Sequence, residues 1–527
     1  MKPRNPDTST PGGMRNTTLA TVVVMSATLG SRVLGFIRQA VINAVFGASG
    51  EADVLNLVFN IPNNLRKLLA EGALSSAFIP VLSASVVRDE SGAEARGVVR
   101  RVLAFQFVVL IPILLGSVLF APQVVGFILD FPEPSRQALA ADLFRWLINY
   151  LLLISVSAVL MGTIHAHQQF LVPAVTPLLF SISVIASVLL LQRRLGVHAM
   201  AVGVLIGGFA QIIFQIPAYR RLGCRFRLSL GFADPLFRKI LRQWLPVVAT
   251  ASIFTVNTQV AMFFASGLED GSGSALTNAL TFWQLPFGIF SASITTVLFP
   301  RMSRQAASND TEGLRTTLRY GVRYLIALLV PSALVMALLG EQIIAVAFQR
   351  GAFALENTIM AARVLRGFCV GLLSVGAYHF FQRFFYSVGD FRTPMVIAGV
   401  TFVLDVALSL WLKETVLAVA GLSLANSIAF TIGLGLMVMR ARAHVGGLGV
   451  REILVTLAKT SVAAGVLVVM SIVFERWSGN DWWQIGSSAL GFGYLIAMCL
   501  AMVFVVVGLY IVMKVDVVAI LLRRKRP

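Results

Sequence analysis

The chain has 527 residues, of which 57% are hydrophobic and only 13% are charged. Soluble domains carry about a quarter charged residues, and their cores cannot bury this much apolar surface. The composition therefore excludes a soluble enzyme, a disordered chain and a disulfide-rich secreted domain, and it indicates a protein that is solvated by lipid. The cysteines, Cys224, Cys369 and Cys499, are too few and too far apart for a disulfide framework or a metal site.

The formal net charge of +19 comes from Lys and Arg placed between apolar segments. In a soluble protein this excess would suggest nucleic-acid binding. In a membrane protein it indicates topology, because cytoplasmic loops retain Lys and Arg. Residues 1–17 are polar, and the sequence predicts no removable signal peptide.

About fourteen apolar segments are long enough to cross a bilayer as helices, each of which takes roughly 20 residues. The segments are continuous rather than alternating, which excludes a transmembrane β-barrel. The sequence therefore predicts an all-α polytopic membrane protein. The predicted spans cover residues 18–46, 52–83, 101–121, 144–164, 172–192, 198–218, 243–267, 275–300, 321–347, 357–387, 394–412, 416–439, 453–474 and 487–513.

Charge alternates between the successive loops that connect these spans. The basic segments are 84–100, 219–242, 301–320, 440–452 and the tail 514–527. The loops between them are acidic or nearly neutral, except for Arg193 and Arg194. This bias predicts an even number of spans with both termini in the cytoplasm.

A weak internal repeat predicts two related halves. Phe-Gly-Ala-Ser-Gly at 46–50 and Phe-Ala-Ser-Gly at 264–267 each precede a proline-containing span that ends in a second proline, Pro80 or Pro300. Both spans run towards a basic loop, so the halves are expected to be parallel six-helix lobes. The predicted regions are a cytoplasmic segment 1–17, an N-lobe 18–218, a basic linker 219–242, a C-lobe 243–439, two further helices in 453–513 and a cytoplasmic tail 514–527.

The first two predicted spans contain more cations than acids. Placing one Arg at mid-membrane costs about 2.5–3.5 kcal/mol on insertion scales, so the excess indicates a cavity that receives an anion. The alternative is that these side chains extend to the membrane surface or pair with Asp53 and Glu71. The cations are Arg32, Arg38, Arg66 and Lys67.

Other intramembrane charges are weaker candidates. Asp405 is positioned to bind a coupling cation or proton, or to pair with a neighbouring helix. Arg363 is expected in the cavity, whereas Arg383 and Lys459 lie near the inner face and are expected to extend towards it. The sequence contains no HExxH motif, P-loop or Asp-rich metal motif, so it predicts a transporter rather than an enzyme or ATP-driven pump.

Two long motifs resemble those of a known family. Ser31–Arg38 (SRVLGFIR) and Ile61–Pro80 (IPNNLRKLLAEGALSSAFIP) are similar to the helix-one and helix-two signatures of the MurJ/MviN lipid II flippases. Further similarity covers Phe348–Gly351 (FQRG), the segment 385–394 and Gly421–Ala425 (GLSLA). The resemblance extends over essentially the whole chain.

This resemblance implies the fold of the superfamily that includes multidrug exporters and oligosaccharide flippases. Its members have two six-helix lobes around a cationic cavity, and the last two helices form a groove for a polyprenyl tail. The cavity arginines of the family correspond to Arg32, Arg38 and Arg66, and Asp53 and Glu71 match acidic family positions.

The second lobe departs from the family pattern. Thr281 and Gln284 stand where many relatives have Arg and Glu, and Ala261 replaces an acid that binds a cation in some relatives. Asp405 resembles the other acid of that cation site. The pyrophosphate site is therefore expected to depend mainly on the first lobe, with Thr281, Gln284 and Arg363 as secondary contacts.

The resemblance implies a lipid II flippase of the bacterial inner membrane. Such a protein moves the undecaprenyl-pyrophosphate-linked peptidoglycan precursor to the outer leaflet by alternating access, for cell-wall biogenesis and cell shape. No cofactor is expected; Na⁺, H⁺ or the membrane potential would drive transport. Expected partners are lipid II, membrane lipids and the cell-wall synthesis machinery, without nucleic acid. The alternatives are a flippase or exporter of another polyprenyl-linked oligosaccharide or a drug, and a membrane enzyme acting on polyprenyl phosphates.

Overall fold

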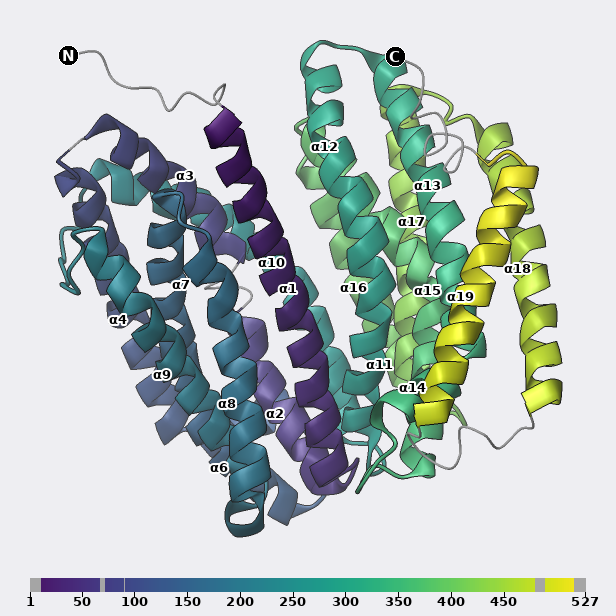
Figure 1. Ribbon diagram of the computed structural model, residues 1–527, viewed down its shortest axis with the longest axis horizontal. Helices are drawn as coiled ribbons and strands as arrows, with labels where there is room; N and C mark the ends of the chain where they lie inside the picture. Colours follow the sequence, from purple (N-terminus) through teal and green to yellow (C-terminus); the bar gives the residue numbers. More distant parts are fainter. Residues whose placement is uncertain (1–10, 67–71, 90, 479–488, 516–527) are drawn as a thin grey trace. The chain divides into compact units, whose positions relative to one another are not determined.

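The computed structural model describes residues 11–66, 72–89, 91–478 and 489–515, and within these ranges the chain forms helices and no strands (Figure 1). This confirms the all-α polytopic prediction. Among the described helices, 11 are long and apolar enough to cross a membrane. The predicted number of about fourteen spans is not confirmed by this criterion, although each predicted span overlaps a helix.

The chain divides into two compact units. Unit 1 comprises residues up to Phe46 and Val54–Val256, and unit 2 comprises Gly47–Asp53 and the chain from Asn257 onwards. Two helices, α2 and α10, continue from one unit into the other. The helices that come before α10 in the chain are α1 (Pro11–Phe46), α2 (Gly50–Arg66), α3 (Gly72–Arg88), α4 (Ala93–Leu119), α5 (Ala121–Ile128), α6 (Pro134–Leu147), α7 (Tyr150–Ala166), α8 (Leu171–Leu195) and α9 (His198–Arg221).

The helices of unit 2 follow the same pattern of long apolar rods with short connections. They are the C-terminal part of α10 (Pro235–Ser266), α11 (Ser272–Pro286), the π-helical turn η2 (Phe287–Ser291), α12 (Ala292–Ala307), α13 (Thr311–Leu338), α14 (Gly340–Phe348), α15 (Leu355–Ser387), α16 (Arg392–Leu412), α17 (Val419–Val445), α18 (Val450–Ser478) and α19 (Ala489–Val512). The π turn directly after Pro286 interrupts a predicted span, as the proline content suggests.

The segment that was predicted as a linker, 219–242, packs onto unit 1. Tyr219, Cys224, Phe237 and Ile240 belong to the same buried cluster as residues of α3, α4 and α7. Between these anchors the segment is open to its surroundings, since Phe226, Leu228 and Leu230 are exposed together with the neighbouring arginines. Burial raises the pKa of the Cys224 thiol, which keeps it protonated and unreactive.

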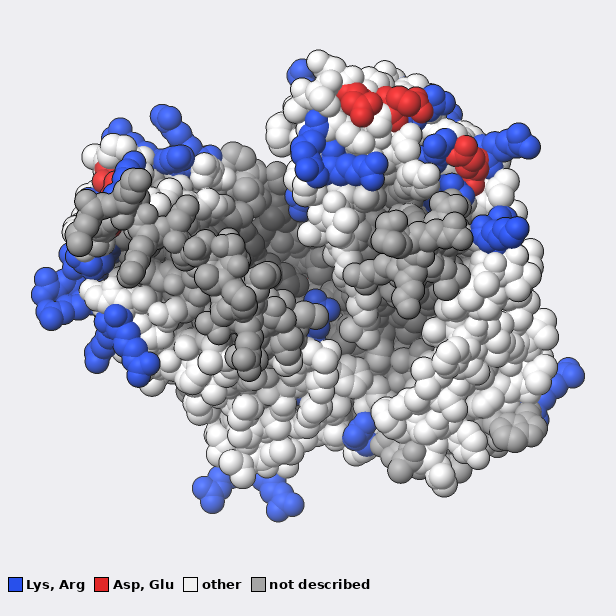
Figure 2. Space-filling view, turned by 45° about the horizontal axis from the view of Figure 1, so that its top comes forward, with Lys and Arg blue, Asp and Glu red and all other residues white. Residues whose placement is uncertain are grey.

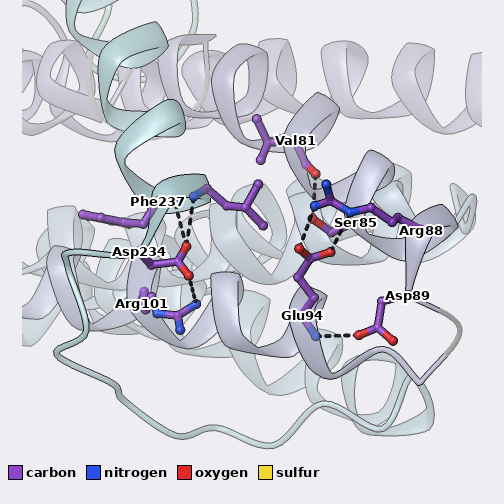
Figure 3. Close-up of polar contacts among 9 residues, drawn as sticks. Val81, Ser85, Arg88, Asp89, Glu94, Arg101, Asp234 and Phe237 are labelled. Carbon is purple, nitrogen blue, oxygen red and sulfur yellow. Dashed lines mark hydrogen bonds and ion pairs between the residues drawn. The ribbon is translucent and has the colours of Figure 1, made fainter.

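Polar contacts hold the start of α10 against α4 (Figure 3). The Asp234 carboxylate accepts hydrogen bonds from the backbone N–H groups of Leu236 and Phe237 at 3.1 and 3.0 Å, and it lies 3.2 Å from Arg101 Nη1. At the start of α4, Asp89 accepts a 2.8 Å hydrogen bond from the Glu94 N–H, and this contact lowers the pKa of Asp89. Each carboxylate accepts hydrogen bonds from backbone N–H groups that have no partner within the helix, because they lie at its start.

The described charges lie mainly at helix ends. Figure 2 shows Lys and Arg in small groups that are separated by broad uncharged surface. In unit 1, Arg101 pairs with Asp234 at 3.2 Å, and in unit 2, Arg319 Nη1 lies 2.7 Å from Glu452 Oε2. These pairs join basic loops that the charge pattern assigned to the same side of the membrane.

Unit 2 is built around α15, which packs closely against α17. Gly367 and Gly371 of α15 face Ser423 and Ser427 of α17, and the Ser427 hydroxyl donates a 2.7 Å hydrogen bond to the Gly367 carbonyl. Small residues spaced by four allow two membrane helices to approach this closely. On another side of the unit, α18 and α19 lie beside α13 (Figure 1). Tyr510 of α19 donates a 2.7 Å hydrogen bond to the Ala327 carbonyl of α13.

We predict that Gly371→Ala destabilises the protein. A Cβ at this position would lie 2.6 Å from the Cα of Ser427, so the two helix backbones must separate. Such overpacking costs about 1–3 kcal/mol and should lower the thermal unfolding temperature of the purified protein in detergent. Gly399→Ala on α16 is the matched control, because nothing lies within 4 Å of its Cβ. Equal unfolding temperatures for the two variants would contradict this account of α15–α17 packing.

Candidate functional site

The three predicted substrate-binding arginines all lie in unit 1. Arg32 and Arg38 are on α1, and Arg66 is the last described residue of α2. The helix α1 runs unbroken through Gly35, which lies between the two arginines. Arg32 is exposed, whereas Arg38 and Arg66 are half-buried. The structure therefore places these three arginines in one unit and keeps Arg32 accessible, while Lys67 lies outside the described residues.

Aromatic rings hold Arg38 in place. Its guanidinium carbon lies 5.1 Å from the centroid of the Phe180 ring, which is itself packed against Tyr150 at 5.2 Å and Phe59 at 6.4 Å. A guanidinium over an aromatic face is stabilised by a cation–π interaction, which leaves its N–H donors available at the edges. Phe180 was missed by sequence reasoning, because it is one apolar residue among many in its span.

Arg66, at the end of α2, contributes a second guanidinium to unit 1. Arg66 Nε donates a 3.1 Å hydrogen bond to Asn63 Oδ1, one turn earlier on α2. The two arginines are close enough for their charges to repel each other. In the described part of the chain Arg38 has no carboxylate partner. Such a pair favours an anion that accepts hydrogen bonds from both groups.

Asp53, which the sequence predicts as a substrate contact, lies against the start of α11. It is buried, and its carboxylate accepts hydrogen bonds from the backbone N–H groups of Gly271 at 2.8 Å and Ser274 at 2.7 Å. It thereby caps the start of α11, where helix N–H groups otherwise lack partners. The geometry favours a structural role for Asp53 over substrate contact. Glu71, the other predicted acid, lies outside the described residues.

The second-unit candidates are spread over α11 and α15. Thr281 is half-buried, and its hydroxyl donates to the Thr277 carbonyl at 3.0 Å, while Gln284 and Arg363 are exposed. Arg366, one turn after Arg363, pairs with Glu341 at 2.7 Å. Gln284 and Arg363 are therefore accessible, whereas the Thr281 hydroxyl is hydrogen-bonded within its own helix.

Asp405 is buried among neutral hydrogen-bond donors. The side-chain amides of Asn257 and Asn426 donate to its Oδ2 at 2.8 and 2.7 Å, and the Ser409 hydroxyl lies 3.4 Å from its Oδ1. The sequence pattern points to Ala261 on α10, whereas the residue that contacts Asp405 is Asn257, one turn earlier on the same helix. Within the described residues, no group of three His, Cys, Asp or Glu side chains is placed to hold a metal ion.

Residues 42–490 match the family model described as lipid II flippase MurJ. A probable lipid II flippase MurJ from Borreliella burgdorferi is 30% identical over 503 residues, which cover 95% of this chain and 98% of the relative. A protein of the same description from Vibrio cholerae is 30% identical over 79% of this chain and 81% of the relative.

The solved structures that share the fold include the following two. The structure titled lipid II flippase MurJ, inward closed conformation, aligns with a TM-score of 0.77 and 22% identity over 95% of this chain and 100% of its own. An inward-facing multidrug resistance transporter of the MATE family, from the MOP superfamily, aligns with a TM-score of 0.65 and 16% identity over 81% of this chain and 98% of its own. The helical architecture is therefore similar to both.

We predict that Asp53→Ala destabilises the protein by about 1–2 kcal/mol, because two backbone N–H groups at the start of α11 lose their acceptor. Asp53→Asn keeps one acceptor oxygen and should lose less. The measurement is the thermal unfolding temperature of both variants, followed by lipid II binding by the folded fraction. A large loss of lipid II affinity at unchanged stability would show that Asp53 contacts the substrate instead.

Proposed function

Because the chain belongs to the lipid II flippase MurJ family, we propose that it moves lipid II from the inner to the outer leaflet of the bacterial cytoplasmic membrane. The observation that carries this proposal is the family match over residues 42–490, which includes Arg66 and the Asp405 site. The protein is a multi-pass membrane transporter rather than an enzyme. The peptidoglycan precursor is the substrate, membrane lipids surround the spans, and we expect the cell-wall synthesis machinery to act on the product.

The arginines of unit 1 would hold the pyrophosphate of lipid II. Arg38 presents N–H donors around the edge of the Phe180 ring, and Arg66 lies close enough to repel it. A diphosphate between the two guanidinium groups relieves this repulsion and accepts charge-assisted hydrogen bonds from both. Arg32, which is exposed on α1, is available to a third oxygen. Alternating access would then expose the head group on the outer side while the polyprenyl tail stays in lipid.

We predict that Arg32→Ala, Arg38→Ala and Arg66→Ala each abolish or severely reduce flipping. Loss of one hydrogen bond to a charged group costs about 1.5–3 kcal/mol, which corresponds to roughly a 10- to 100-fold loss of lipid II affinity. The measurements are lipid II binding at equal expression and growth of cells that depend on each variant. Normal growth with all three variants would overturn the assignment. Failure of the wild-type chain to replace a lipid II flippase would instead favour another substrate.

The second unit should contribute less to pyrophosphate binding. Thr281 and Gln284 are neutral, and neutral groups act only in contact, whereas a charge also attracts at a distance. We expect Thr281→Ala and Gln284→Ala to be mild and Arg363→Ala to be intermediate in the same binding assay. If either neutral variant is as damaging as Arg66→Ala, the substrate charge is not held mainly by the first unit.

We also propose that the Asp405 site holds a monovalent cation or a proton. Asp405 is buried with neutral donors only, so its negative charge lacks a compensating positive group among the described residues. Asp405, Asn257, Asn426 and Ser409 offer carboxylate, amide and hydroxyl oxygens, which are the ligands that hard cations prefer. A bound cation would supply positive charge at this site and couple its gradient to transport. The membrane potential is the alternative source of energy.

We predict that Na⁺ raises the unfolding temperature of the wild-type protein relative to choline at equal ionic strength, because binding to the folded state stabilises it. Asp405→Asn, which removes the charge but keeps a similar shape, should abolish the difference. A response of the wild type to pH but not to Na⁺ would assign the site to a proton. No response to either would overturn the proposal.

The orientation of the chain follows from its basic loops. Those loops contact one another at one end within each unit, through Arg101–Asp234 and Arg319–Glu452. Since Lys and Arg are retained in the cytoplasm, we propose that both termini are cytoplasmic. We expect a reporter that works only inside the cell to be active when it is fused to residue 527. Activity of a reporter that works only outside the cell would contradict this topology.

A further inference from the structure

A basic cavity in unit 1 lies between the C-terminal parts of α7 and α9 and the connection that leads to α10. Its volume is about 610 Å³, which is within the range of ligand-binding pockets. Leu160 and Ile216 belong to the apolar part of its wall. The charged part consists of Arg220, Arg225 and Arg227, all of which are exposed. Three guanidinium groups therefore border one cavity, and none of them is an arginine of α1 or α2.

The connection that carries two of these arginines is held to unit 1 on both sides of them. Gly223 has a φ of 71°, a left-handed conformation in which the chain turns after the end of α9. Cys224 is buried in the same cluster as residues of α3, α4 and α7. Further along, the Ser229 N–H donates a 3.4 Å hydrogen bond to the Arg100 carbonyl of α4. The two arginines lie between these contacts, so the segment that presents them is anchored at both ends.

Two arginines of α4 add positive charge beside the cavity. Arg96 Nη1 lies 3.7 Å from the point that a Cβ of Gly223 would occupy, and Gly223 lines the cavity. Arg96 and Arg100 also lie close enough to the Cys224 thiol, which lines the cavity too, for their charges to act on it. Positive charge therefore surrounds the cavity from α4, from α9 and from the connection.

The nearby acids are engaged in other contacts. Asp234 pairs with Arg101 at 3.2 Å, and Glu94 Oε1 lies 2.6 Å from Arg88 Nη2 (Figure 3). No Asp or Glu is among the described residues that line the cavity, and no described carboxylate forms an ion pair with its three lining arginines. The cavity therefore presents uncompensated guanidinium groups, which favour an anion.

The surroundings of the cavity indicate that this anion comes from the bilayer. The cavity lies where the membrane-spanning helix α9 ends, which is the level of the lipid head groups. Phe226 and Leu228 alternate with Arg225 and Arg227, and these two apolar side chains are 52% and 50% exposed. Exposed apolar side chains between cations are typical of segments that enter the membrane boundary while the cations bind head groups.

We propose that this cavity binds the phosphate group of an anionic phospholipid, such as phosphatidylglycerol, in the leaflet that the basic loops face. Guanidinium groups match the geometry of phosphate oxygens and donate charge-assisted hydrogen bonds to them. A zwitterionic lipid fits less well, because its ammonium group meets arginines and no carboxylate in the described wall. The site shares no residue with the pyrophosphate site proposed on α1 and α2, and it does not depend on the proposed transport function.

The direct test measures the binding of dioctanoyl phosphatidylglycerol to the full chain in dodecyl maltoside. We expect it to bind about fivefold more tightly than dioctanoyl phosphatidylcholine, which has the same phosphate and acyl chains but no net charge. Inorganic phosphate tests a soluble source of the same group and should not displace the lipid at equal concentration. Equal affinity for the two lipids, or displacement by equimolar inorganic phosphate, would overturn the proposal.

Matched variants test whether the lipid binds at the cavity. Arg225→Gln and Arg227→Gln each remove one lining charge and should weaken phosphatidylglycerol binding about fivefold, with phosphatidylcholine binding unchanged. Arg238→Gln is the control, because Arg238 is an exposed arginine of the same basic segment that does not line the cavity. It should bind like the wild type. If one lining variant does not fold, the other decides. Unchanged affinity in a folded lining variant, or an equal loss in Arg238→Gln, contradicts the proposed site.

Discussion

The cost of placing a guanidinium group in an apolar helical bundle is the constraint on which the candidate site depends. Arg38 has no carboxylate partner in the described part of unit 1, yet its helix belongs to a chain that is 57% hydrophobic. The Phe180 ring at 5.1 Å provides part of the compensation, and it does so without consuming the N–H donors. An arginine held in this way remains able to bind an anion, whereas an arginine in a saturated ion pair does not.

The same constraint explains why acids in this protein have such different roles. Asp53 gives its oxygens to two backbone N–H groups and thereby fixes the start of α11. Asp234 caps α10 and pairs with Arg101. Asp405 is surrounded by amides and a hydroxyl, which solvate a carboxylate without neutralising it. The charge of Asp234 is paired with Arg101, whereas the neutral donors around Asp405 leave a negative charge for an ion or a proton to compensate.

Close packing of small residues sets the framework around these groups. In unit 2, Gly367 and Gly371 let α15 approach α17 until backbone and side-chain hydroxyls form hydrogen bonds directly. In unit 1, bulky rings instead separate α4 from α10, and the space that they leave becomes a cavity lined by Gln106, Ser155 and Trp244. Small residues therefore set a close helix contact in unit 2, and bulky rings set a wider one in unit 1.

The sequence by itself determined the helical membrane architecture, the approximate limits of the spans and the family, because hydropathy and contiguous motifs are local properties of the chain. It also located the arginines of unit 1 and Asp405, since a charge in an apolar segment is visible without a structure. Only the tertiary structure decided what these residues contact. Asp53 meets the start of α11 from 221 residues away, and Asn257 reaches Asp405 across 148 residues. Such pairings arise from helix packing. On α10, the residue one turn before Ala261 is Asn257, so one turn of the helix separates an inert side chain from a hydrogen-bond donor.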